Sequence, residues 1–134
     1  MNNKTESAKE METGNYVELF FYWVPKKNHD AMVQLDKQFT GVFAKHGGTG
    51  MEFFQLSNSK AMEGLDSIAK VLPVGEDEEL WVELNYYKDQ KHYDDTVAKL
   101  MKDESAAPLF KQFSDLITQK KSMIMGGFSR VRVL

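Results

Sequence analysis

The sequence predicts an α+β domain in which one antiparallel sheet carries helices on a single face. Four short segments are rich in β-branched and aromatic residues, as strands are. Two longer segments repeat apolar residues every three to four positions, as helices do. These segments follow one another as β-α-β-β-α-β, an order typical of the split βαβ arrangement of ferredoxin-like folds.

The first strand and helix have clear boundaries. Residues 16–24 are dense in aromatic and β-branched residues and stop at Pro25, which predicts a strand. Asn28 or Asp30 can cap the following helix, and Gly47 can terminate it. The apolar positions of this helix are Met32, Leu35, Phe39, Val42 and Phe43.

The middle of the chain contains two strands separated by an irregular segment. Residues 51–57 form the second strand, and residues 80–87, with clean alternation, form the third. Between them, residues 58–77 lack regular patterning apart from a short helix predicted around 65–71.

The last part of the chain predicts a broken helix and a final strand. Asp89 is placed to cap the helix, whose pattern breaks near Ser105 and restarts at Pro108, a residue suited to a first helical turn. Its apolar positions are Tyr93, Val97, Leu100, Met101, Phe110, Phe113, Leu116 and Ile117. Residues 123–134 form the fourth strand, in which Gly126-Gly127 suggests a bulge or a close backbone approach.

Length and composition limit the function classes. The chain has 134 residues, enough for one domain over 15–134 after a disordered polar tail at 1–14. It has no Cys, which excludes disulfides and thiolate metal sites, and its net charge of −3 argues against nucleic acid as a partner. No stretch is long and apolar enough for a membrane helix or a signal peptide, so we expect a cytoplasmic protein. We predict no cofactor and no metal site.

Strand alternation assigns side chains to the two faces of the sheet. We expect the apolar sets to face the helices: Val17, Leu19, Phe21, Trp23, Leu80, Val82, Leu84, Tyr86, Met123, Met125, Val131 and Val133. The helix-free face then carries Glu18, Phe20, Tyr22, Trp81, Glu83, Asn85, Tyr87, Ile124, Phe128, Arg130 and Arg132. Such a mixture of aromatic and charged groups predicts a covered face: a second subunit, or a ligand pocket shared with it. The third possibility is a monomer whose helix-free face is exposed to solvent.

The helix-free face also supplies the candidate site, for which we predict a small-molecule ligand. Arginine can bind a carboxylate through two hydrogen bonds, and aromatic rings can stack on an organic ring. Burial can raise the pKa of a carboxyl group, which can then act as a base. The candidate residues are Glu18, Tyr22, Trp81, Glu83, Asn85, Arg130 and Arg132.

Other motifs favour structural roles. His29, His46 and His92 are not spaced as metal ligands, although folding can bring His46 or His92 beside a carboxylate. The acidic run 76–79 and the pair 94–95 are typical of solvated surfaces, and Gly47 to Gly50 lie after a helix rather than before one, the wrong polarity for a phosphate loop.

Several segments together resemble the small, uncharacterised YbaA-like family. The matching residues are Tyr16-Val17, Val24-Pro25-Lys26-Lys27-Asn28, Lys45-His46-Gly47, Tyr87-Lys88, His92, Asp94 and Met123-Ile124-Met125-Gly126-Gly127-Phe128. The resemblance implies a dimeric α/β barrel, in which two ferredoxin-like sheets face each other around a cavity, and it implies no activity. The sequence departs from the family pattern at Tyr93, where relatives typically carry Arg, and at Leu19 and Trp23.

Three functions remain open. The first is a homodimeric barrel that binds or converts a small, partly aromatic or anionic molecule. The second is a dimeric interaction or regulatory module with no small-molecule ligand. The third is RNA binding through Phe20, Tyr22 and Trp81 on the sheet, against which the carboxylates of Glu18 and Glu83 argue because they repel phosphate.

Overall fold

Four strands form one antiparallel sheet in the computed structural model, which describes residues 13–133. The strands are β1 (Tyr16–Pro25), β2 (Gly50–Gln55), β3 (Glu78–Tyr87) and β4 (Ile124–Ser129), in the spatial order β2-β3-β1-β4. Each helical connection therefore joins two strands that have a third strand between them, so the predicted split βαβ arrangement is confirmed. The predicted polar tail lies almost wholly outside the described residues.

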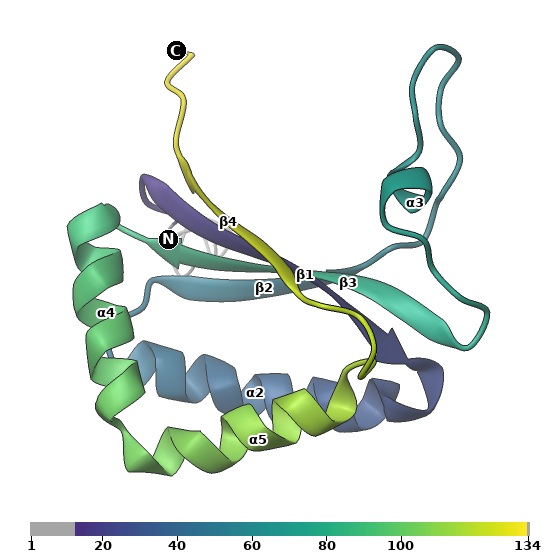
Figure 1. Cartoon of the computed structure of the whole chain (residues 1–134). Coiled ribbons are helices and arrows are strands. Elements are labelled where there is room, and N and C mark those ends of the chain that lie inside the picture. The colour runs from purple at the N-terminus through teal and green to yellow at the C-terminus, as the bar shows by residue number, and fades with distance from the viewer. Residues whose placement is uncertain (1–12, 134) are drawn as a thin grey trace, which may run out of the picture.

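Three helices pack on one face of this sheet (Figure 1). They are α2 (His29–Lys45), α4 (Gln90–Lys102) and α5 (Ala107–Leu116); short 3-10 turns η1 (Lys26–Asn28) and η2 (Glu104–Ala106) precede α2 and α5. The Asp89 carboxylate caps α4 by accepting a 2.7 Å hydrogen bond from the His92 amide, as predicted. Pro108 lies in the first turn of α5, also as predicted.

The segment between β2 and β3 leaves the sheet as a long excursion. It contains one short helix, α3 (Ile68–Val71), capped by the Ser67 hydroxyl. The excursion and residues 130–133 both rise on the side of the sheet away from α2 and α5 (Figure 1). The predicted fourth strand was too long: β4 ends at Ser129, and Val131 and Val133 are 79% and 84% exposed instead of facing the helices.

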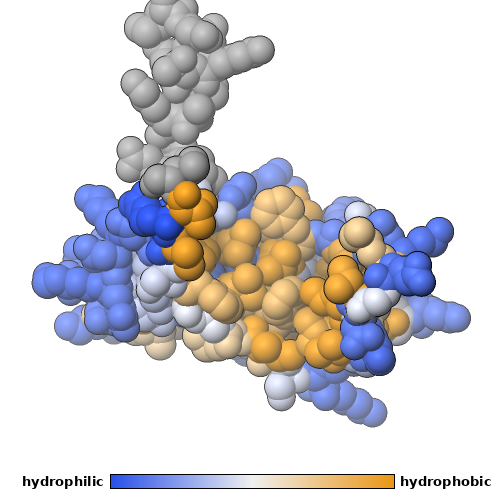
Figure 2. Space-filling view, turned by 90° about the horizontal axis from the view of Figure 1, so that it is seen from above, coloured by the Kyte–Doolittle hydropathy of each residue, from blue (hydrophilic) through white to orange (hydrophobic). Residues whose placement is uncertain are grey.

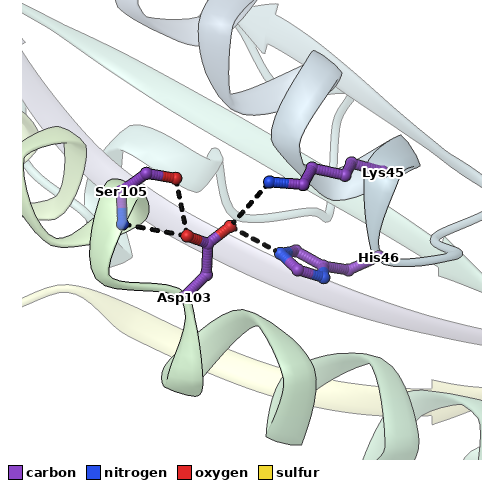
Figure 3. Close-up of polar contacts among 4 residues, drawn as sticks. All are labelled: Lys45, His46, Asp103 and Ser105. Atoms are coloured by element: carbon purple, nitrogen blue, oxygen red, sulfur yellow. Dashed lines mark hydrogen bonds and ion pairs between the residues drawn. The ribbon is translucent and has the colours of Figure 1, made fainter.

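The Asp103 carboxylate fastens the α4–α5 junction to the end of α2 (Figure 3). One of its oxygens lies 2.7 Å from His46 Nε2 and 3.4 Å from Lys45 Nζ, and the other accepts bonds from the Ser105 amide and hydroxyl. These hydrogen bonds lower the pKa of Asp103. The same carboxylate therefore caps η2 and joins the α4–α5 junction to the C-terminal end of α2.

The sheet faces are reversed for β1 and β3 relative to the sequence prediction. Tyr22 and Trp81 are 1% and 4% exposed and belong to the core that packs on α2 and α5. The remaining core members are Val24, Met32, Leu35, Phe39 and Leu109, with Phe20, Val33, Val42, Met51, Phe113, Leu116 and Ile117 packed against them. The even-numbered residues of β1 and the odd-numbered residues of β3 therefore point toward the helices.

The opposite side, here called the helix-free face, is mainly apolar. By register and alternation it carries Val17, Leu19, Phe21, Phe54, Val82, Leu84, Tyr86, Ile124 and Phe128. Phe54, Ile124 and Phe128 are 50%, 44% and 54% exposed. Seen from above, apolar side chains fill the middle of this face and polar ones surround it (Figure 2). The prediction for Ile124 and Phe128 was right, whereas Glu18, Phe20, Tyr22, Trp81, Glu83, Asn85 and Tyr87 lie on the other side.

Candidate functional site

A cavity of about 360 Å³ lies between the sheet and the three packed helices. Phe39 and Phe43 of α2, Val97 of α4 and Phe110 and Phe113 of α5 form much of its wall. Met101, Phe110 and Met123, which are 70%, 39% and 36% exposed, lie where it opens to solvent. The sheet side contributes most of its polar groups, from β1 and β3.

Glu18 of β1 is one of these polar groups, and it is only 6% exposed. Its carboxylate accepts a 2.8 Å bond from the Tyr93 hydroxyl and a longer 3.4 Å bond from the Tyr87 hydroxyl. Burial raises the pKa of Glu18, while the bonds from Tyr93, Asn85 and Tyr87 act in the opposite direction. Two tyrosines from different elements thus hold a carboxylate inside an apolar wall.

Glu83 of β3 is the second carboxyl group of the cavity. It accepts a 3.1 Å hydrogen bond from the hydroxyl of the buried Tyr22. Burial raises the pKa of Glu83 to about 7, opposed by hydrogen bonds from Asn85 and Tyr22 and assisted by the charge of Glu18. A carboxyl group with this pKa is present in both protonation states near neutral pH, as a group that both takes and gives protons requires.

Asn85 connects the two carboxyl groups. Its side chain lies between them and, as a hydrogen-bond donor, lowers the pKa of each. The residue is 7% exposed, yet its Oδ1 atom has no hydrogen-bond partner among the described residues. A buried acceptor without a donor is costly, so this atom is an unsatisfied hydrogen-bond acceptor on a residue of the cavity wall.

Asp36 of α2 is a third buried carboxyl group, which the sequence analysis missed. It is 5% exposed, its Oδ2 atom has no partner among the described residues, and burial together with the Glu83 charge raises its pKa to about 8. It lines a neighbouring pocket of about 350 Å³ between α2 and β2, where Trp81 also lies. The sequence does contain a signal for it: Asp36 stands in the helical apolar stripe beside Leu35 and Phe39.

The predicted site residues divide into two groups. Glu18, Tyr22, Glu83 and Asn85 do come together, and Trp81 shares their face of the sheet, but they lie beneath the helices rather than on the helix-free face. The buried positions of Tyr22 and Trp81 also remove the stacking surface that RNA binding required.

The two arginines, by contrast, lie away from the carboxylates. Arg130 Nε donates a 2.7 Å bond to the Gly14 carbonyl, and another of its nitrogens bonds to the Thr13 hydroxyl. Arg132 bonds to the Asn15 side chain. Both arginines follow the end of β4 and bond to the segment before β1. They therefore do not line the site of Glu18 and Glu83 and cannot bind a ligand carboxylate there.

The three histidines make structural contacts. His29 Nδ1 lies 2.8 Å from the Glu79 carboxylate, and His46 bonds to Asp103 as described above. His92 accepts the Lys88 amide at Nδ1, so its Nε2 donates the 2.7 Å bond to the Gly47 carbonyl. Within residues 13–133, no three His, Asp or Glu side chains form a group that can hold a metal ion.

The chemistry open to this arrangement is proton transfer. Glu18 and Glu83 are coupled carboxyl groups in a shared apolar setting, and paired carboxyls of this kind take acid and base roles. The walls of the cavity are mainly apolar, and its mouth, beside Met101, Phe110 and Met123, admits a small molecule.

The sequence matches, over residues 15–115, the family described as protein of unknown function (DUF1428). No curated protein matches the chain. In the part of the chain that the structure describes, no helix has the length and apolar character needed to cross a membrane.

Proposed function

We propose that this chain, which belongs to the DUF1428 family of proteins of unknown function, catalyses proton transfer on a small, mainly apolar molecule held in the interior cavity. The observation that carries the proposal is the Glu83 carboxyl group at the cavity wall, coupled to Glu18 and hydrogen-bonded to Tyr22. Its raised pKa places its titration near neutral pH, where a general acid–base group works best.

The reaction class that fits best is reversible removal of a proton beside a carbonyl group. The substrate C–H bond breaks, its proton passes to the Glu83 carboxylate, and the electron pair moves onto the carbonyl to form an enolate. The same carboxyl group then returns a proton to that carbon or to another position of the enolate. No oxidant or reductant takes part, so the step balances with the groups at hand.

Deuterium exchange tests this proposal directly. The protein is incubated in D2O with small ketones such as propiophenone and cyclohexanone, and mass spectrometry follows deuterium gain at the α-carbon. We expect exchange above the buffer rate, reduced at least about 100-fold by Glu83→Gln. The matched control is Glu52→Gln, which removes a carboxylate bonded to Tyr86 on the helix-free face and leaves exchange unchanged. Exchange at the buffer rate, or equal exchange in Glu83→Gln, contradicts the proposal.

We further propose that two copies of the chain join through the helix-free face as a dimeric α/β barrel, the assembly implied by the YbaA-like resemblance. The apolar, partly exposed side chains of that face support this, because an open patch of this kind normally meets a partner. Exposed apolar residues also occur on the two segments that rise beside the face, among them Met62, Leu65, Val71, Val131 and Val133. In this assembly the cavities stay separate, one behind each sheet.

A further inference from the structure

We infer that the molecule bound in the interior cavity is an organic cation: an apolar body that carries a protonated amine. The inference rests on the proposed function, because it assigns the substrate class of the same cavity. Three features of the cavity lead to it: the hydrogen-bonding character of its polar groups, the composition of its wall, and its charge.

The free polar groups of the cavity are acceptors. Asn85 Oδ1 is buried without a partner among the described residues, and the Glu18 carboxylate accepts but cannot donate when ionised. The nearby hydroxyl protons are already engaged, since Tyr22 donates to Glu83 and both Tyr87 and Tyr93 donate to Glu18. A ligand that satisfies these acceptors must bring N–H or O–H donors, and an ammonium group brings three.

The wall of the cavity is rich in aromatic rings. Seven of its described lining residues are Phe or Tyr: Phe20, Phe39, Phe43, Tyr87, Tyr93, Phe110 and Phe113. Ring faces attract cations through their quadrupole, most strongly where water is excluded. The same rings bury an apolar body, so the wall suits both parts of an amphiphilic amine.

The charge of the cavity selects against anions. Of the described residues that line it, none is Lys, Arg or His, whereas Glu18 and Glu83 both carry carboxyl groups. A ligand carboxylate would face these groups without a compensating cation, while an ammonium group would pair with Glu18. An ammonium group beside the reacting carbonyl also offsets the negative charge of the enolate that forms when Glu83 takes a proton.

Three probes of similar size that differ in charge test the inference. The full-length protein is titrated at pH 7.5 with 2-phenylethylamine, 2-phenylethanol and 3-phenylpropionate, and binding is followed by calorimetry. We expect the amine to bind at least about tenfold more tightly than the alcohol, and the carboxylate to bind least. Equal or tighter binding of the alcohol or the carboxylate overturns the inference, as does the lack of amine binding at millimolar concentration.

Variants then locate the cation. Glu18→Gln should weaken amine binding about tenfold and leave alcohol binding within about twofold, while Glu52→Gln changes neither. Unchanged amine binding in a folded Glu18→Gln protein overturns the inference. If that variant does not fold, Asn85→Leu, which removes the unpartnered acceptor, takes its place and should weaken amine binding about tenfold. Unchanged amine binding in a folded Asn85→Leu protein overturns the inference in the same way. The two proposals can fail separately. If the protein exchanges neutral ketones but does not prefer the amine, only the assignment of a cationic ligand is contradicted. If it prefers the amine but exchanges no ketone, only the proton-transfer proposal is contradicted.

Discussion

The Tyr93 hydroxyl donates a 2.8 Å hydrogen bond to the Glu18 carboxylate and so joins α4 to β1 across the interior cavity. The bond gives Tyr93 a defined role here: a neutral donor stabilises the Glu18 carboxylate without adding positive charge to the cavity. Burial and the Glu18 contact raise the pKa of Tyr93 to about 12, so its proton stays in place at neutral pH.

Replacing Tyr93 with Phe should raise the pKa of Glu18 further. The variant removes the strongest donor to a carboxylate that burial already disfavours, and the loss of one such bond costs about 1 kcal/mol of stability. NMR titration of the glutamate side-chain carbons measures the pKa directly. Tyr86→Phe is the matched control, because it removes a hydroxyl bonded to Glu52 on the helix-free face. A Glu18 pKa that is the same in both variants contradicts this role for Tyr93.

Replacing Asp36 with Asn should flatten the dependence of stability on pH. The pKa of Asp36 is raised from 3.8 to about 8 in the folded protein, so between these values the folded state holds a proton that the unfolded state has released. The free energy of unfolding then falls as pH rises through this window. The amide side chain of the variant cannot ionise, and we expect the variant to gain about 4 kcal/mol relative to wild type between pH 5 and pH 8.5, at about 1.4 kcal/mol for each pH unit up to the folded pKa.

Urea denaturation at pH 5, 6, 7, 8 and 8.5 measures this difference. The control is Asp30→Asn, the same substitution at an exposed position in the first turn of the same helix, and it should change the free energy of unfolding far less. Parallel curves for wild type and Asp36→Asn would show that Asp36 is ionised in the folded protein across the window.

The sequence predicted the elements of the fold well but assigned the faces of two strands wrongly. Caps and breaks such as Asp89 and Pro108 depend on a few neighbouring residues, so a local pattern is enough to place them. Face assignment relied on the rule that polar side chains point away from the core. Glu18 and Glu83 break the rule because hydroxyl groups far away in the chain satisfy them: Tyr93 is 75 residues from Glu18, and Tyr22 is 61 residues from Glu83. No local pattern reveals such partners.

The same reasoning explains which site residues were found. The four residues Glu18, Tyr22, Glu83 and Asn85 alternate along two adjacent strands, so parity alone grouped them on one face. Arg130 and Arg132 were added by extending the alternation past the end of β4, where it no longer holds. Asp36 was missed because it belongs to a helix, and contact between a helix and a strand is not visible in strand parity.

Replacing Phe128 with Asp should abolish the proposed dimer. Phe128 lies opposite Val17 on the helix-free face and is 54% exposed, so a carboxylate there is tolerated by one chain but would be buried against a second. Light scattering after size exclusion should give twice the 15.4 kDa chain mass for wild type and the single mass for the variant. Met101→Asp, at an exposed position of α4, serves as the control and should stay dimeric. A wild-type monomer contradicts the assembly.

Replacing Gly127 with Ala should destabilise the protein, because the backbone passes very close to a tyrosine there. A Cβ atom at this position would lie 1.9 Å from the Tyr16 hydroxyl oxygen, the close approach that the Gly126-Gly127 pair suggested. The Tyr16 ring, whose centre lies 5.3 Å from that of Tyr93, would have to shift from its packed position, and we expect a loss of about 1–3 kcal/mol in the free energy of unfolding.

The neighbouring glycine supplies the comparison. An alanine Cβ at Gly126 would meet only the ring of Phe128, at 3.2 Å, and that exposed side chain can move, so Gly126→Ala should cost much less. The double variant Tyr16→Phe, Gly127→Ala should recover part of the loss, because the atom nearest to the new methyl group is gone. Equal losses in Gly126→Ala and Gly127→Ala, measured by urea denaturation, would mean that the cost arises in the strand backbone and not at Tyr16.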